Sequence, residues 1–158
     1  MLRHYAPLKL MKQQIFTVKK IDDWKAVAQA VARELTPGTI LGLSGPLGAG
    51  KTTFVQYLAE ELGAEKRPKS PTFTLRRDYS IIGGRSMITK LIHVDAYRIE
   101  RSEDLLPLNL DEDLLAPGTA VAIEWPENVK EWIAKRKATF RSLEIRLGKG
   151  EEREVFFT

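Results

Sequence analysis

The sequence predicts an α/β fold in which a parallel core sheet carries an antiparallel hairpin extension and has helices on both faces. Strand-like and helix-like patterns alternate up to residue 62, as they do in parallel sheets. From residue 72 onward, extended runs joined by glycine turns dominate, which is typical of antiparallel hairpins. The length of 158 residues, 43% of them hydrophobic, predicts one domain, with residues 1–12 forming an irregular N-terminal arm.

The alternating half contains two strand–helix pairs. Asp22 is placed to cap the first helix, whose apolar residues recur at helical spacing from Trp24 onward. Pro37 and Gly38 end that helix, and Gly63 ends the second. In chain order the predicted elements are strand 14–18, helix 24–35, strand 39–44 and helix 52–62.

The second half is mainly extended. Alternating residues before and after Gly83 and Gly84 predict a β-hairpin, and a second hairpin turns at residues 148–150. In chain order the predicted elements are extended runs 72–81 and 87–94, short helical turns 105–115, strand 119–123, a short helix 128–134, and strands 143–147 and 155–157.

A glycine-rich loop joins strand 39–44 to helix 52–62. Its sequence, Gly45-Pro-Leu-Gly-Ala-Gly-Lys-Thr52, fits G-x-x-x-x-G-K-[ST] at every fixed position. Such a loop wraps backbone N–H groups around a β-phosphate and directs a helix N-terminus at it. The flanking strand and helix favour this interpretation over a simple glycine-rich turn. We therefore predict a nucleoside-triphosphate site in a P-loop NTPase-like sheet.

The loop residues have distinct expected roles. Lys51 bridges the β- and γ-phosphates, and the Thr52 hydroxyl is a ligand of Mg²⁺. The glycines permit backbone angles and a close approach that a Cβ would obstruct. The residues expected to bind the nucleotide are Gly45, Pro46, Leu47, Gly48, Ala49, Gly50, Lys51, Thr52, Thr53 and, from a separate segment, Thr72.

Two predicted strands end in an acid, Asp95 and Glu124. In open α/β sheets the ligand crevice lies beyond the carboxyl ends of the strands, so both acids are expected to face the phosphates. One would hold Mg²⁺, directly or through water, and the other would position the attacking water. For either acid alone, capping a neighbouring helix explains the position equally well. The pair, together with the P-loop, favours catalytic roles for Lys51, Asp95 and Glu124.

Further residues leave two interpretations open. The hydroxyls of Ser70-Pro-Thr-Phe-Thr74 either reach the γ-phosphate or metal, or satisfy backbone groups at a strand start. Arg98 either neutralises transition-state charge or pairs with an acid. For His93, inside an apolar strand, a structural role is the better interpretation. Trp125 is either a contact for nucleotide or partner, or a core aromatic.

The composition excludes several classes of protein. Without cysteine there is neither a disulfide framework nor a thiolate metal site, and two histidines are too few for a His-rich centre. No run reaches the length of a transmembrane helix and no secretory signal is present, so we expect a cytoplasmic protein without a membrane partner. A net charge of +4 is compatible with phosphate ligands, an acidic partner or RNA. The basic residues are scattered, which disfavours direct RNA recognition.

Taken together, these motifs resemble one family. The P-loop, Ser70-Pro-Thr-Phe-Thr74, His93-x-Asp95-x-Tyr97-Arg98 and Glu124-Trp-Pro-Glu127 are similar in order and spacing to the small bacterial ATPase family TsaE, also called YjeE. The resemblance covers residues from 14 to the C-terminus. Residues 1–12 extend beyond the usual start, and Ala96 stands where a larger apolar residue is common.

This resemblance implies a Mg²⁺-dependent ATPase that acts with the proteins TsaB and TsaD. Together they help to install threonylcarbamoyl on N6 of adenosine 37 in tRNAs reading ANN codons, and tRNA is engaged indirectly, through the complex. By resemblance, Lys51 is the phosphate lysine, Thr52 and Glu124 are metal ligands, Asp95 supports hydrolysis, and Thr72 lies in a switch-like segment. The isolated chain is expected to be a monomer.

Two alternatives remain at this stage. The first is a small-molecule P-loop kinase, although the acidic, leucine-rich stretch 101–115 does not resemble an arginine-rich lid. The second is a binding module whose surface is shaped by ATP. Release of free phosphate without an acceptor separates hydrolysis from the kinase.

Overall fold

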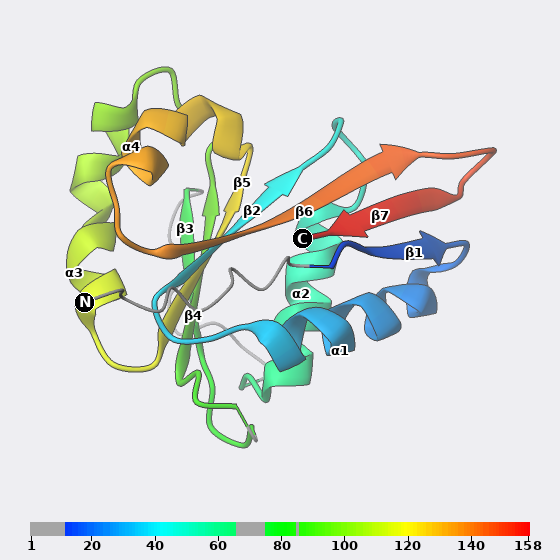
Figure 1. Ribbon diagram of the computed structural model, residues 1–158, viewed down its shortest axis with the longest axis horizontal. Coiled ribbons are helices and arrows are strands. Elements are labelled where there is room, and N and C mark those ends of the chain that lie inside the picture. Colours follow the sequence, from blue (N-terminus) through cyan, green and yellow to red (C-terminus); the bar gives the residue numbers. More distant parts are fainter. Residues whose placement is uncertain (1–11, 66–74, 85) are drawn as a thin grey trace, which may run out of the picture.

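A computed structural model describes residues 12–65, 75–84 and 86–158. Its strands are β1 (Gln14–Val18), β2 (Thr39–Ser44), β3 (Arg76–Ser80), β4 (Lys90–Asp95), β5 (Thr119–Glu124), β6 (Thr139–Leu147) and β7 (Arg153–Phe157). They form a seven-stranded sheet in the order β1-β7-β6-β2-β5-β4-β3 (Figure 1). The central strands β6, β2, β5 and β4 are parallel to one another, and antiparallel strands complete both edges. The predicted α/β sheet with a parallel core is confirmed.

Helices cover both faces of this sheet. They are α1 (Trp24–Glu34), α2 (Lys51–Leu62), α3 (Leu110–Leu115) and α4 (Lys130–Ala134), with 3₁₀ turns η1 (Ile21–Asp23), η2 (Ser102–Leu108) and η3 (Pro126–Val129). Figure 1 shows α1 and α2 to one side of the central strands and α3 and α4 to the other. The helical turns expected over 105–115 and the helix expected over 128–134 are both present, although each begins as a 3₁₀ turn.

The two long helices follow from their apolar spacing. In α1 the buried residues Trp24, Val27, Ala28 and Val31 lie on one stripe, and the chain turns extended at Leu35, before Pro37. The predicted cap at Asp22 is wrong. Asp22 lies inside η1, and the neighbouring Asp23 instead accepts the backbone N–H groups of Lys19 and Lys20 at 2.9 and 3.1 Å.

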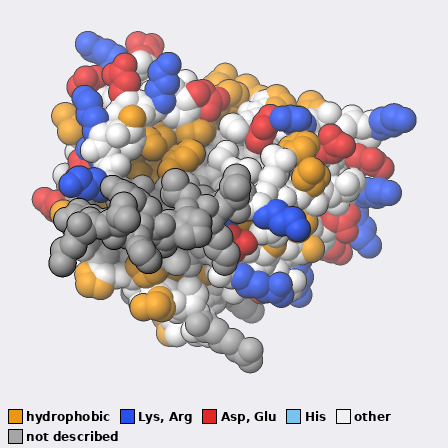
Figure 2. All heavy atoms as spheres, in the orientation of Figure 1, with side chains coloured by type: hydrophobic (Ala, Val, Ile, Leu, Met, Phe, Trp, Pro, Cys, Tyr) orange, Lys and Arg blue, Asp and Glu red, His pale blue; other side chains and the backbone are white. Residues whose placement is uncertain are grey.

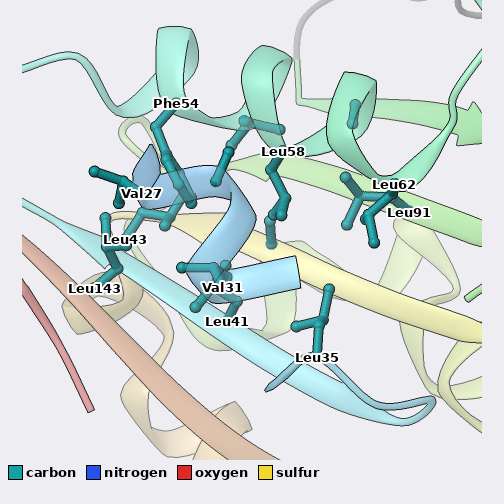
Figure 3. Packing of buried hydrophobic residues seen from close by; sticks show 14 of the residues in the cluster. Val27, Val31, Leu35, Leu41, Leu43, Phe54, Leu58, Leu62, Leu91 and Leu143 are labelled. Carbon is teal, nitrogen blue, oxygen red and sulfur yellow. The ribbon is translucent and has the colours of Figure 1, made fainter. Parts of the chain in front are cut away.

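The core has two parts, one on each face of the sheet. On the first face, α1 and α2 pack their apolar stripes against alternate residues of the strands, as Figure 3 shows for Val31, Leu41 and Leu58. On the second face, residues of the other register, such as Ile40 and Ile92, pack against η2, α3 and α4. Side chains alternate between the two faces of a strand, so a strand buried on both sides appears as a continuous apolar run.

The C-terminal region differs from the prediction. Strand β6 begins at Thr139 rather than at residue 143, and it pairs in parallel with β2 before β7 folds back on it. Strand β1 then adds to the outer edge of β7. Figure 2 shows basic and acidic side chains interspersed over the right-hand end of this face, where Figure 1 places β6 and β7. The expected strand over 87–94 starts only at Lys90.

Some of the predicted segments lie wholly or partly outside the described residues. Residues 1–11 of the predicted arm lie outside the described residues, as do residues 66–74, which include Thr72 and the hydroxyl-rich segment. Strand β3 supplies the described part of the run expected over 72–81. None of the described helices is both long and apolar enough to cross a membrane.

Candidate active site

The glycine-rich loop connects the end of β2 to the start of α2, at the carboxyl edge of the parallel strands. Gly45, with φ 150°, and Gly50, with φ 110°, both have positive φ. A Cβ on Gly45 would lie 2.7 Å from the carbonyl oxygen of Ile145, and one on Gly50 would lie 2.7 Å from the Trp24 ring. Gly50 is also the N-cap of α2, and having no side chain it cannot cap the first-turn N–H groups. Those groups are therefore suited to an anion.

Lys51 begins α2, and its side chain curls back over the loop. Its Nζ donates to the carbonyl oxygens of Gly45 at 2.5 Å and Pro46 at 2.9 Å, and lies 4.3 Å from the centroid of the Trp125 ring. The residue is 5% exposed. Burial lowers the pKa of Lys51, although Glu124, Glu127 and Asp95 oppose the shift. A desolvated ammonium group on a phosphate-binding loop interacts strongly with an anion.

Thr52, Glu124 and His93 are joined by hydrogen bonds. The Thr52 hydroxyl donates to Glu124 Oε1 at 2.6 Å, and His93 Nε2 lies 2.8 Å from the same oxygen. Burial alone would raise the pKa of Glu124, but the hydrogen bonds from His93 and Thr52 outweigh it and hold that pKa below its ordinary value. Glu124 is therefore an ionised carboxylate at neutral pH, and it is next to the hydroxyl predicted to bind metal.

Asp95 lies beside Glu124 because β4 and β5 are in parallel register and end together. Its Oδ1 accepts the backbone N–H of Tyr97 at 3.0 Å. Asp95, Glu124, Lys51 and Thr52 all line a cavity of about 280 Å³ whose floor is the loop. The remaining lining residues are Leu47, Gly48, Ala49, Gly50, Thr53, Tyr97 and Trp125. The structure thus brings the two strand-end acids and the loop to one place.

Other sequence candidates have different positions. Arg98 is exposed and is not among the residues that line this cavity. Trp125 packs against the second-face core and also lines the cavity over Lys51. A contact with nucleotide or partner stays a prediction. The backbone of Trp125 is left-handed, with φ 58°, and its N–H donates to the Leu43 carbonyl at 3.1 Å. Tyr97, 48% exposed, stacks at a tilt on Trp125 with ring centroids 5.2 Å apart.

Sequence reasoning missed a second wall of the loop. A cavity of about 250 Å³ adjoins Gly48, Gly50 and Thr53 on the side of η1 and β7. Trp24 forms part of it, and Arg153 also contacts the loop by donating to the carbonyl of Ala49 at 3.2 Å. Neither Trp24 nor Arg153 belongs to a recognisable sequence motif. The pairing of β6 with β2 and of β7 with β6 brings Arg153 near residue 48.

A cavity larger than the loop cavity lies far from this chemistry. About 660 Å³ in volume, it lies between the C-terminal ends of α1 and α2 and the turn at Gly83 and Gly84. That is the opposite edge of the sheet, where the parallel strands begin. Its volume exceeds that of the loop cavity, but its lining contains neither the loop nor the strand-end acids, so we take the smaller cavity as the candidate site.

The residues at the loop fit a magnesium nucleotide. Thr52 and Glu124 supply oxygen donors of the kind that Mg²⁺ prefers, and the uncapped N-terminus of α2 suits phosphate. Within the described ranges no group of three or more His, Asp or Glu side chains is placed to hold a metal. Magnesium bound with a nucleotide typically has only one or two protein ligands and shares its coordination with the phosphates.

Known proteins are similar to this chain over most of its length. The family model described as "Threonylcarbamoyl adenosine biosynthesis protein TsaE" matches residues 18–155. The protein named "tRNA threonylcarbamoyladenosine biosynthesis protein TsaE" of Bacillus subtilis is 36% identical over 149 residues, which is 94% of this chain and 87% of the relative. Its counterpart in Mycobacterium bovis is 34% identical over 131 residues, with 79% and 76% covered.

A solved structure is similar as well. The crystal structure of YdiB from Bacillus subtilis superposes with a TM-score of 0.69 at 31% sequence identity, covering 92% of this chain and 84% of that one. The family match spans both the loop and the strand-end acids, and the structural similarity covers 92% of the chain. The chain belongs to the TsaE family.

Proposed function

We propose that the protein is a Mg²⁺-dependent ATPase needed for threonylcarbamoylation of N6 of adenosine 37 in tRNAs that read ANN codons. In this proposal it is a cytoplasmic accessory subunit, monomeric when isolated, that acts with TsaB and TsaD and engages tRNA through their complex. Family membership supports the pathway. The meeting of Lys51, Asp95 and Glu124 around one cavity is the observation that carries the proposed hydrolysis.

Each residue has a proposed task. Lys51 would exchange the carbonyls of Gly45 and Pro46 for phosphate oxygens, since its ammonium already lies over the loop. Thr52 and Glu124 would hold Mg²⁺, which when bound neutralises charge on the phosphates. Glu124, and not Asp95, accepts the hydrogen bond from Thr52, so Asp95 would be the acid that positions the attacking water. Thr72 stays a predicted nucleotide contact.

The second cavity supports a whole nucleotide as ligand. It adjoins the phosphate loop at Gly48 and Gly50 and is lined by Lys19, Lys20 and Arg153, whose positive charges suit a nucleotide.

The structure also bears on the kinase alternative. Residues 102–115 form η2 and α3, whose Leu105 and Leu110 are buried against the second face of the sheet. The acidic stretch is thus part of the core packing and not a lid over the loop, which favours hydrolysis over transfer to a bound acceptor.

The decisive experiment measures phosphate release from ATP by the purified protein, with and without the TsaB–TsaD complex. We expect Mg²⁺-dependent release of phosphate that the complex accelerates. Activity that needs an added acceptor and yields a phosphorylated product would identify a kinase. Lys51→Ala that leaves reconstituted tRNA modification intact would refute a role for hydrolysis.

A further inference from the structure

His93 contacts the proposed metal ligand Glu124, although the sequence favoured only a structural role for it. It lies in β4 on the face covered by α2, and its side chain is 5% exposed. Its register partner in β5 is Ala122, and Glu124 is two residues further along that strand. Because Ala122 carries only a methyl group, the imidazole has room to cross to the Glu124 carboxylate, 2.8 Å away.

The direction of this hydrogen bond is fixed by chemistry. An ionised carboxylate only accepts, so His93 Nε2 must carry the hydrogen. The Thr52 hydroxyl donates to the same oxygen, Oε1. Two donors from different elements, one from the sheet and one from the first turn of α2, therefore determine the orientation of the Glu124 carboxylate.

A bound cation would affect the two donors differently. Thr52 is itself a proposed ligand, so its position depends on the cation. His93 sits in a buried strand between Ile92 and Val94, both 0% exposed, and does not line the loop cavity. The hydrogen bond from His93 can therefore hold Glu124 in place whether or not the cation is bound. Residues that do not touch a metal commonly orient its ligands in this way.

We propose that His93 is a positioning residue that holds the Glu124 carboxylate in the orientation required by a divalent cation bound with the nucleotide. The proposal rests on the proposed Mg²⁺-nucleotide site but is separate from the rate of hydrolysis. A merely structural histidine would contribute to folding stability alone. A positioning histidine sets the affinity of the site for the cation.

The test compares three variants with the unaltered protein. His93→Leu removes the donor, and His93→Gln keeps an N–H at the position of Nε2. Ile92→Ala is the matched control, because it removes buried apolar volume from the same strand on the opposite face. Mn²⁺ serves as the probe, and its binding to each protein in the presence of ADP is measured by electron paramagnetic resonance.

We expect His93→Leu to raise the Mn²⁺ dissociation constant at least about tenfold. His93→Gln should recover most of that affinity, and Ile92→Ala should lose stability without a change in Mn²⁺ affinity. The affinity for ADP in the presence of EDTA should be the same in all four proteins. If His93→Leu does not fold, His93→Asn replaces it, since the shorter amide does not reach the position of Nε2.

The outcomes separate the two proposals. Unchanged Mn²⁺ affinity in His93→Leu, or an equal loss in His93→Gln and Ile92→Ala, would overturn the positioning role and leave the proposed ATPase standing. If the unaltered protein binds no Mn²⁺ with ADP, the metal site and with it both proposals fail.

Discussion

Two clusters of charged side chains use the same strand, β4, and they are built differently. The edge cluster consists of Arg76, Asp78, Lys90 and Asp113, and it joins β3 and the first residue of β4 to α3. The nucleotide cluster consists of Lys51, Thr52, His93, Asp95 and Glu124, and it lies at the other end of β4.

The edge cluster is matched in charge. Arg76 and Lys90 each contact both Asp78 and Asp113, at distances of 2.6 to 3.2 Å. Burial would raise the pKa of each acid, but the hydrogen bonds from the two cations keep both values below the ordinary range. Side chains that satisfy one another in this way stabilise the fold and offer little to a ligand.

In the nucleotide cluster, by contrast, the lysine forms no hydrogen bond to a carboxylate of the described residues. Its cation, Lys51, bonds to backbone carbonyls instead of a carboxylate, and its two acids face a cavity. Burial lowers the pKa of Lys51 despite the acids around it. The comparison teaches that charge paired within the protein marks structure, whereas charge aimed at a cavity marks a site.

The largest expected effect is in the nucleotide cluster. Lys51→Ala removes the ammonium over the loop and should lower ATP hydrolysis by about 10²- to 10³-fold, as the loss of a transition-state charge donor does. Phosphate release at saturating ATP measures it. Lys25→Ala, an exposed lysine of α1, is the control and should keep full activity. Equal losses in both variants would contradict the assignment.

Glu124→Gln tests the acid that accepts from Thr52 and His93. The amide keeps the shape but loses the charge, so we expect hydrolysis to fall about 10²-fold, with a higher Mg²⁺ concentration needed for half-maximal rate. Glu144→Gln is the control, since its exposed carboxylate pairs only with Arg146 among the described ion pairs. An unchanged Mg²⁺ requirement in Glu124→Gln would show that this carboxylate is not a metal ligand.

Asp113→Asn should act on stability and not on turnover. It removes the charge that both Arg76 and Lys90 contact, and we expect the free energy of unfolding to fall by about 1–2 kcal/mol. Urea denaturation measures the loss. Asp111→Asn, on the same helix but more exposed, should cost less. A drop in the catalytic rate of Asp113→Asn would erase the distinction between the clusters.

The smallest effect is in the pH dependence of stability. Because the pKa of Asp113 is lower in the folded protein than its ordinary value of 3.8, its contribution is present above that pH and is lost as the pH falls through the folded pKa. The free energy of unfolding should therefore decline below about pH 4, and less steeply in Asp113→Asn. Urea titrations at successive pH values measure the slope, and parallel slopes would contradict the prediction.

Local sequence patterns were sufficient for much of this molecule. The P-loop was predictable because its glycines, lysine and threonine are adjacent in the chain and stand between a strand-like and a helix-like pattern. The strand-end position of Asp95 and Glu124 predicted that they would meet, since parallel strands in register end at one edge. The roles of these residues remain predictions.

Contacts between distant segments were not predictable in this way. The first residues of β6, Thr139 to Ser142, do not form a continuous apolar run, and β2 supplies the hydrogen-bonding edge along which they become a strand. The hydrogen bond between His93 and Glu124 was not predictable either, because the two residues are 31 apart and the methyl of Ala122 leaves the path between them.

The sequence by itself therefore determined the family, the α/β class and the residues of the phosphate loop, because each depends on patterns that are short or ordered along the chain. Only the tertiary structure decided which charges are paired and which face a cavity. That distinction depends on strand register and on the small side chains between the partners, and neither can be observed until the strands are side by side.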